Sequence, residues 1–233
     1  PKKVKALHAA LGIDTIDKLR DACERDEVAG LKGFGAKTQQ KILEGIRFLG
    51  TVGNRVRFDM AYPLGLALLE QLKALPGVQR AELCGSLRRR RETAKDIDIV
   101  LSAADPQPVM DAFVSLPQVI QVTGHGPTKS SVVAALALGH ERVVLAADLR
   151  IVTDEQFPYA VLHFTGGQAH NIRLRQRAID RGLLLNEYAL TGPAGNVPCA
   201  DEADVYRALG LAWAPPEMRE DTGEVELMEA GAV

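Results

Sequence analysis

The first fifty residues of the chain have the hydrophobic spacing of helices and show no strand-like alternation. Asp14 is suited to cap the N-terminus of a helix that runs to Cys23. Two glycines then interrupt the pattern within residues 31–38, and a second amphipathic helix follows, with Ile42 and Ile46 on one face. The pattern predicts helices that are joined by a glycine-containing turn.

From about residue 60 the pattern alternates between helix and strand. Helices are expected at residues 64–75 and 108–115, and strands at residues 78–84, 97–101, 130–138 and 142–152. The last two strands meet at Gly139-His140, so they are expected to form a hairpin. Strands that alternate with helices, together with a hairpin, predict an α+β fold with a mixed sheet.

Beyond residue 155 the pattern returns to helix. Residues 169–181 form the clearest helical segment, and Gly182 follows it as a C′ glycine would. The segment after Trp213 begins with Pro215-Pro216 and is acidic and polar. We expect this segment to be a loop or a frayed tail.

Charge is distributed unevenly along the 233 residues. The net charge of −2 taken alone argues against a nucleic-acid partner, because nucleic-acid-binding domains are usually basic. However, residues 1–200 carry 26 Lys and Arg against 21 Asp and Glu, whereas residues 201–233 carry 2 against 9. Partners respond to local fields, so a basic body with an acidic end remains compatible with a nucleic acid.

Composition excludes several classes of protein. Hydrophobic residues make up 46% and charged residues 25%, which is typical of a globular protein and not of a disordered one. Three scattered cysteines are too few for a disulfide framework and indicate free thiols in a reducing compartment. No apolar run reaches the ~18 residues that a membrane-spanning helix needs. We expect a cytoplasmic monomer that does not contact a membrane.

Two carboxylates open the predicted strand at residues 97–101. Asp96 and Asp98 are two positions apart, so both side chains lie on one face of the strand. Like charges this close are unfavourable unless cations lie between them, and divalent metal ions supply that compensation. Asp148, a single acid among apolar neighbours, is the best candidate for a third carboxylate. The alternatives are an exposed pair of acids at a strand start and an Asp148 that pairs with Arg150.

The residues before this acidic pair add phosphate-binding chemistry. Gly85-Ser86 ends a predicted strand and enters a short helix, where backbone N–H groups and a hydroxyl can bind phosphate. Arg88 and Arg89 follow directly and offer guanidinium donors for phosphate oxygens. Two of the four arginines at 88–91 are expected to face solvent only. Together with the acids, these residues predict a compact site for a nucleoside triphosphate and metal.

These motifs resemble the palm signature of the nucleotidyltransferase superfamily, and specifically of the polymerase beta-like family X DNA polymerases. The resemblance extends over nearly the whole chain. It is carried by Gly-Ser-Leu-Arg-Arg at 85–89, Asp-Ile-Asp at 96–98, Asp-Leu-Arg at 148–150, His-Phe-Thr-Gly at 163–166, Leu-Asn-Glu-Tyr at 185–188 and Leu-Gly-Leu…Pro-Pro-Glu at 209–217. The motif at residues 209–217 resembles the bacterial branch of the family in particular.

The resemblance implies a role for each matched residue. Asp96, Asp98 and Asp148 would be the catalytic ligands of two Mg²⁺ ions, with Mn²⁺ as an alternative metal. The nucleotide-binding residues would be Gly85, Ser86, Arg89 and Lys95 at the phosphates, Phe164, Thr165 and Gly166 at the sugar, and Asn171 at the base. Arg175 would contact the template strand of DNA. Without the surrounding motif, Asn171 and Arg175 would also fit the polar face of a surface helix.

Three positions depart from the family pattern. Lys95 replaces the glycine that usually precedes the first catalytic aspartate, His163 replaces a tyrosine, and Ile172 replaces a lysine found in some relatives. The phosphate contacts at Lys95 and the discrimination between sugars at His163 are therefore open. None of the three changes removes a metal ligand.

The stretch at residues 31–38 resembles the helix-hairpin-helix motif of DNA-repair proteins. Gly33 and Gly35 would let the backbone approach a DNA phosphate, and Lys37 on the following helix favours an anion. Such contacts position DNA without reading its sequence. A helix end followed by an ordinary turn is the alternative. Residues 2–7 align with residues 37–42, which follow Gly35. This weak repeat predicts that Pro1 follows another such hairpin.

We therefore expect a duplex-binding helix-hairpin-helix region at 1–58, a catalytic palm at 59–155, and a nucleotide-selecting helical domain with a small sheet at 156–233. The expected function is DNA-directed addition of a dNTP to a primer 3′-hydroxyl, in short-gap repair of gapped or primer–template duplex. The alternatives are a template-independent nucleotidyltransferase and a DNA-binding module with little catalysis. The resemblance also implies a fragment without the family's N-terminal end-binding domain and the bacterial C-terminal phosphoesterase domain.

Overall fold

The computed structural model describes residues 2–52 and 55–229, without the side chains of residues 47–52. The chain divides into two units, Pro1–Asn54 and Arg55–Val233, which are described separately. Pro1, which we expected to follow another hairpin, lies outside the described residues. Among the described residues, none of the helices combines the length and apolar character that a membrane crossing requires.

The first unit contains α1 (Lys2–Leu11), α2 (Ile16–Glu24) and α3 (Ala36–Val52), and no strand in its described part. Its small core includes Leu7, Cys23 and Val28. The predicted N-cap was wrong by one position. Thr15 caps α2, because its hydroxyl accepts a hydrogen bond from the backbone N–H of Lys18 at 3.2 Å. Asp14 instead pairs with the Lys18 ammonium at 2.8 Å.

The second unit is built on a five-stranded mixed sheet, as predicted. Its strands lie in the order β2-β4-β7-β6-β5, and only the β4–β7 pair is parallel. The bounds are β2 (Val78–Leu83), β4 (Asp96–Ala103), β5 (Val119–His125), β6 (Lys129–Leu138) and β7 (Glu141–Val152). The sequence pattern did not predict β5, whose side chains are mostly exposed and lack a clear apolar alternation.

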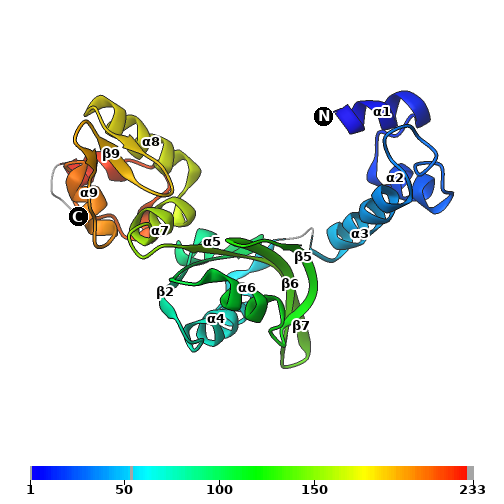
Figure 1. Ribbon diagram of the computed structural model, residues 1–233, viewed down its shortest axis with the longest axis horizontal. Helices are drawn as coiled ribbons and strands as arrows, with labels where there is room; N and C mark the ends of the chain where they lie inside the picture. Colours follow the sequence, from blue (N-terminus) through cyan, green and yellow to red (C-terminus); the bar gives the residue numbers. More distant parts are fainter. Residues whose placement is uncertain (1, 53–54, 230–233) are drawn as a thin grey trace. The chain divides into compact units, whose positions relative to one another are not determined.

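Two helices bury their apolar faces against this sheet. Helices α4 (Phe58–Lys73) and α6 (Pro106–Val114) lie on the same side of the sheet in Figure 1 and share one core with it. Leu64 and Phe113 from these helices are fully buried with Ile97 and Leu145 of the sheet. Helix α4 begins six positions earlier than predicted, because it continues through Pro63, which would ordinarily mark a helix boundary.

The C-terminal part of this unit adds helices and a small sheet. The helices are α7 (Phe157–Thr165), α8 (Gln168–Asp180), α9 (Glu202–Ala208) and α10 (Glu224–Glu229), with the 3₁₀ turn η1 (Pro216–Met218). The small sheet contains β8 (Leu184–Leu185), β9 (Leu190–Gly192) and β10 (Gly195–Asn196). Gly182 follows α8 at a positive φ of 71°, so the predicted C′ glycine is confirmed.

The expectation of a loop or frayed tail after Trp213 was right only in part. Residues 214–223 are mostly irregular apart from η1, but they are packed into the unit and are followed by α10, and residues 230–233 lie outside the described residues. Arg219 is fully buried, and Glu224 of α10 is almost fully buried. The acidic side chains of this end pair with arginines from the rest of the unit, so its negative charge is neutralised locally. These pairs are Glu202 with Arg88, Glu217 with Arg90, Glu220 with Arg89, Glu226 with Arg173, and Glu229 with Arg177.

Candidate active site

The three predicted acids lie on two neighbouring strands. In the parallel pair of β4 and β7, Asp98 is directly opposite Asp148, and Asp96 lies two positions earlier on the same face. Asp96 is exposed, whereas Asp98 and Asp148 are partly buried. The sheet register therefore brings together carboxylates that are far apart in the sequence.

The environment of Asp98 opposes its negative charge. Burial, followed by the neighbouring carboxylates of Asp96 and Asp148, raises the pKa of Asp98 from its ordinary 3.8 to about 7. The cations of Lys129 and Arg89 act in the opposite direction but do not compensate fully. A cation bound among these acids would stabilise the ionised form of Asp98.

An Asp98→Asn variant measured in EDTA is expected to melt roughly 3–8 °C above the wild type at pH 8, with little difference at pH 4. The folded-state pKa lies above the unfolded value, so ionisation of Asp98 increasingly destabilises the folded wild type as the pH rises from about 4 to about 7. Calorimetry across this range checks the expectation, with the exposed Asp111→Asn as control. Equal melting temperatures of wild type and Asp98→Asn at pH 8 would contradict it.

Gly85 allows the chain to turn directly beside Asp98. It starts the short helix α5 (Gly85–Arg88) at a positive φ of 60°, and a Cβ there would lie 2.3 Å from the Asp98 Oδ2. The neighbouring Cys84 N–H donates a hydrogen bond to the backbone carbonyl of Asp98 at 2.7 Å. The turn that carries Ser86 is thus fixed against the strand that carries the acids.

A Gly85→Ala variant is expected to lose about 100-fold or more in the rate of the dNTP addition that the sequence predicts. It is also expected to lose about 1–3 kcal/mol in unfolding free energy. The added methyl group must displace either the turn or the Asp98 carboxylate. Gly139→Ala is the matched control, because Gly139 has a similar φ of 62° but open space around the new Cβ. Full activity in Gly85→Ala would show that this contact is unimportant.

A cleft of about 660 Å³ opens beside these residues. It is lined by all of the predicted nucleotide-binding residues, and Asp148 adjoins it through its register with Asp98. The lining residues predicted from the sequence are Gly85, Ser86, Arg89, Lys95, Asp96, Asp98, Phe164, Thr165, Gly166, Asn171 and Arg175. Residues around α5 and β4 and residues of α7 and α8 therefore line one cleft.

The four consecutive arginines have two different environments, as predicted. The side chains of Arg88 and Arg89 are 17% and 16% exposed, whereas those of Arg90 and Arg91 are 69% and 51% exposed. Arg89 reaches the cleft, where its Nε lies 2.8 Å from the Glu220 Oε1. Arg89 therefore has a carboxylate partner that a phosphate would have to replace.

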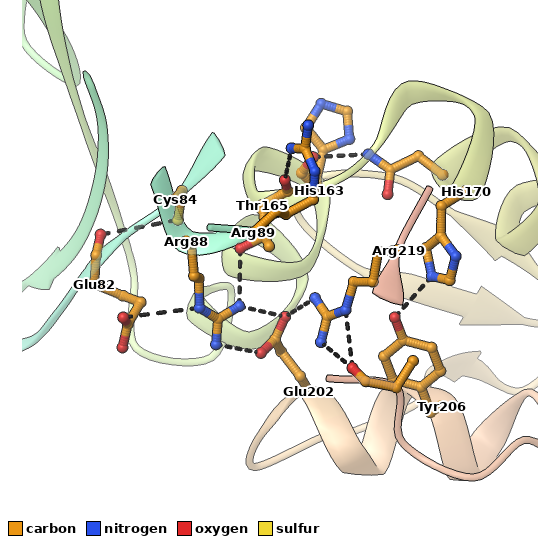
Figure 2. A network of polar contacts seen from close by, with 12 residues as sticks. Glu82, Cys84, Arg88, Arg89, His163, Thr165, His170, Glu202, Tyr206 and Arg219 are labelled. Carbon is orange, nitrogen blue, oxygen red and sulfur yellow. Dashed lines mark hydrogen bonds and ion pairs between the residues drawn. The ribbon is translucent and has the colours of Figure 1, made fainter. Parts of the chain in front are cut away.

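Arg88 is not available as a phosphate ligand, which corrects the sequence-based interpretation. Figure 2 shows its guanidinium between Glu82 and Glu202, and it donates to both Glu202 oxygens at 2.9 and 2.7 Å. Arg219 donates to the same Glu202 at 2.7 Å. Although burial opposes ionisation, these two arginines lower the pKa of Glu202. The network ties the Gly85 turn to helix α9.

His163 holds both of the predicted base- and template-facing side chains. The Asn171 amide donates to the His163 carbonyl at 2.7 Å, and the Arg175 guanidinium donates to the His163 Nδ1 at 2.9 Å. Arginine only donates, so Nδ1 accepts and the ring carries its proton on Nε2. Burial and Arg175 lower the pKa of His163, which favours this neutral form. Asn171 and Arg175 are thus not the free polar face of a surface helix.

Sequence reasoning missed two polar residues of the cleft, Arg55 and Gln168. Arg55 lies directly before β1 (Val56–Arg57), which pairs with β3 (Thr93–Ala94). Its Nε donates to the Thr93 hydroxyl at 2.7 Å. No local motif marks Arg55, and only the pairing of β1 with β3 brings it to the cleft.

In the first unit, the predicted glycine turn is confirmed. Gly33 and Gly35 have positive φ angles of 89° and 75°, and α3 begins directly afterwards at Ala36. Lys37 is exposed in the first turn of that helix. The turn therefore presents backbone and one ammonium to solvent.

The chemistry of the three acids fits a hard divalent cation. Carboxylate oxygens are preferred ligands of Mg²⁺ and Mn²⁺. Burial, and then the carboxylates of Asp96 and Asp148, raise the pKa of Asp98, and a bound cation would offset both effects. Within residues 2–52 and 55–229, however, no three His, Cys, Asp or Glu side chains already converge as a metal centre. Asp148 instead pairs with the Lys129 ammonium. The donor set fits, but its side chains must still converge.

Comparison with known proteins agrees with this fold. Residues 160–220 match the DNA polymerase beta thumb family, and residues 1–47 match the SAM-like helix-hairpin-helix tandem family. Two crystal structures of Leishmania infantum polymerase beta, a ternary P/T complex and a ternary gap complex, have TM-scores of 0.78 and 0.79. Their sequences are 25% and 24% identical to that of this chain. Each match covers 94% of this chain, and the two matches cover 93% and 85% of the respective polymerase beta chains. The architecture is that of a polymerase beta-like nucleotidyltransferase.

Two curated relatives narrow this assignment. DNA polymerase/3′-5′ exonuclease PolX of Bacillus subtilis is 39% identical over 97% of this chain, and rat DNA polymerase lambda is 26% identical over 59% of it. The chain spans 39% and 28% of the length of these two relatives. These relatives and the thumb and helix-hairpin-helix matches lead to the same conclusion. The chain belongs to family X of the DNA polymerases.

Proposed function

We propose that this chain catalyses DNA-directed addition of a dNTP to a primer 3′-hydroxyl, in the filling of short gaps during DNA repair. The observation that carries the proposal is the register of Asp98 with Asp148 beside the Gly85-Ser86 turn, on a cleft that Asn171 and Arg175 also line. Carboxylates, a phosphate-binding turn and base-facing groups are the components that nucleotidyl transfer requires.

Each group has a task in this reaction. Asp96, Asp98 and Asp148 would hold two Mg²⁺ ions, or Mn²⁺, which would lower the pKa of the attacking hydroxyl and neutralise the leaving pyrophosphate. Ser86 and the backbone at Gly85 face the cleft and would bind phosphate oxygens. The cationic side chains of Arg55, Arg89 and Lys95 line the same cleft and would attract the triphosphate.

The groups on α7 and α8 would select the nucleotide. The backbone from Phe164 to Gly166 would lie along the sugar, and Asn171 would contact the base. Gly166 has a φ of 41°, and a Cβ there would lie 2.8 Å from the Asn171 amide nitrogen, so the turn leaves space for that amide. Arg175 would contact the template strand after leaving His163. In this assignment, residues 59–155 are the palm and residues 156–233 select the nucleotide.

Primer extension on gapped duplex tests the proposal. The wild type is expected to add the complementary dNTP with Mg²⁺ or Mn²⁺ and to add far less to a single strand. Indiscriminate extension of single strands would instead support a template-independent nucleotidyltransferase. DNA binding without metal-dependent extension would support a non-catalytic binding module.

The turn at Gly33–Lys37 is proposed to bind the DNA backbone within residues 1–58. Lys37→Ala is expected to weaken duplex binding severalfold for all sequences and to reduce the slope of log K against log salt by about 1. Fluorescence anisotropy between low and physiological salt measures this slope. Lys18→Ala is the control, because Lys18 is already paired with Asp14. An unchanged slope for Lys37→Ala would exclude this contact.

A further inference from the structure

Lys129 lies beside the proposed catalytic acids but belongs to none of the motifs discussed above. It is the first residue of β6 and is directly opposite Arg150 in the antiparallel pair of β6 and β7. Asp148 is two positions before Arg150, so Lys129 and Asp148 are diagonal neighbours on one face of the sheet. The Lys129 Nζ lies 2.8 Å from the Asp148 Oδ2.

This ammonium compensates part of the negative charge at the acids. Its charge stabilises the ionised form of Asp98 as well as pairing with Asp148. Arg150 of β7 lies on the same face of the sheet, but its guanidinium stacks on Phe164 and not on the acids, since it lies 4.6 Å from the centre of the Phe164 ring. The sequence-based alternative of an Asp148–Arg150 pair is therefore replaced by Asp148–Lys129.

The same pair occupies an oxygen that a metal centre formed by the three acids would use. Asp148 Oδ2 has an ammonium partner at hydrogen-bond distance, and a divalent cation that used this oxygen would have to displace or repel that ammonium. The two cations thus compete for one carboxylate.

We propose that Lys129 is a positioning residue of the active site, which holds Asp148 before a divalent cation binds and competes with that cation for its carboxylate. The inference rests on the proposed function, in which Asp96, Asp98 and Asp148 bind divalent cations. Lys129 holds the Asp148 carboxylate in place on β7, and it weakens the binding of a cation in the absence of substrate. Added negative charge from a triphosphate then favours the cation over the ammonium.

Direct measurement of Mn²⁺ binding tests this without turnover. The affinity of the protein for Mn²⁺, followed by electron paramagnetic resonance without DNA or nucleotide, is expected to rise about three- to tenfold in Lys129→Met. Lys129→Arg keeps the charge and is expected to stay within about twofold of the wild type. Lys73→Met is the matched control, because Lys73 is also 46% exposed and also paired with a carboxylate, that of Glu70.

A double-mutant cycle separates this inference from the proposed function. Asp148→Asn is expected to weaken Mn²⁺ binding, and Lys129→Met added to it is expected to change the affinity by less than about twofold. If Asp148→Asn binds Mn²⁺ as the wild type does, the assignment of Asp148 as a cation ligand fails, and both proposals fall. If Asp148→Asn weakens binding but Lys129→Met does not tighten it, only the role of Lys129 is overturned. Circular dichroism of each variant confirms that it is folded.

Discussion

An Asp148→Ala variant is expected to extend a gapped primer about a thousandfold more slowly than the wild type, or not measurably at all. Asp148 is the only proposed cation ligand on β7, and it lies directly opposite Asp98. Its loss leaves the proposed site with the two acids of β4 alone. Single-turnover extension with saturating dNTP and Mg²⁺ measures the rate.

The control for this variant is binding of the same gapped DNA, which is expected to stay within about threefold of the wild type, because Asp148 carries no positive charge toward phosphate. Asp180→Ala, at the end of α8, serves as a second control and is expected to retain full activity. An Asp148→Ala enzyme that extends primers as fast as the wild type would remove the central assignment of the proposed mechanism.

Arg219→Ala is expected to lower the free energy of unfolding by about 3–5 kcal/mol. The Arg219 guanidinium is fully buried, donates to Glu202 at 2.7 Å and donates twice to the backbone carbonyl of Ala214. Removing it leaves a buried carbonyl without these donors and a buried carboxylate with Arg88 alone. Urea unfolding followed by the fluorescence of Trp213 and by circular dichroism measures the change.

Arg207→Ala provides the comparison for a surface ion pair. Arg207 is exposed and paired with Asp204 within α9, so its loss is expected to cost about 0.5 kcal/mol or less. If Arg219→Ala were as stable as Arg207→Ala, the buried network of Figure 2 would contribute little to the fold.

Local motifs made part of the site predictable from the sequence. Gly85-Ser86 and the Asp96-Asp98 pair lie within one short stretch, and the alternation of a strand fixes the common face of the two acids. Gly182 was likewise predictable, because a helix end has a strong local preference for glycine. The choice between Asp14 and Thr15 as N-cap was not, since both residue types cap helices and only the final backbone geometry separates them.

Contacts between distant segments were not predictable in the same way. Glu220 pairs with Arg89 only because the C-terminal segment packs beside the end of α5, so its acidity was mistaken for the sign of a tail. Lys129 pairs with Asp148 because the β6–β7 hairpin has one particular register, which the sequence pattern does not specify. Arg55 likewise reaches the cleft through the pairing of β1 with β3.

The single parallel pair in the sheet also has a consequence for how the site arises. Strands β5, β6 and β7 are consecutive antiparallel neighbours, so they can assemble through short loops, whereas β4 must wait for β7 to return beside it. During synthesis, a nascent chain that has not yet exposed β7 contains Asp96 and Asp98 without Asp148. The proposed carboxylate site is thus complete only when β4 and β7, which are far apart in the sequence, have paired, so it depends on a non-local contact of the fold.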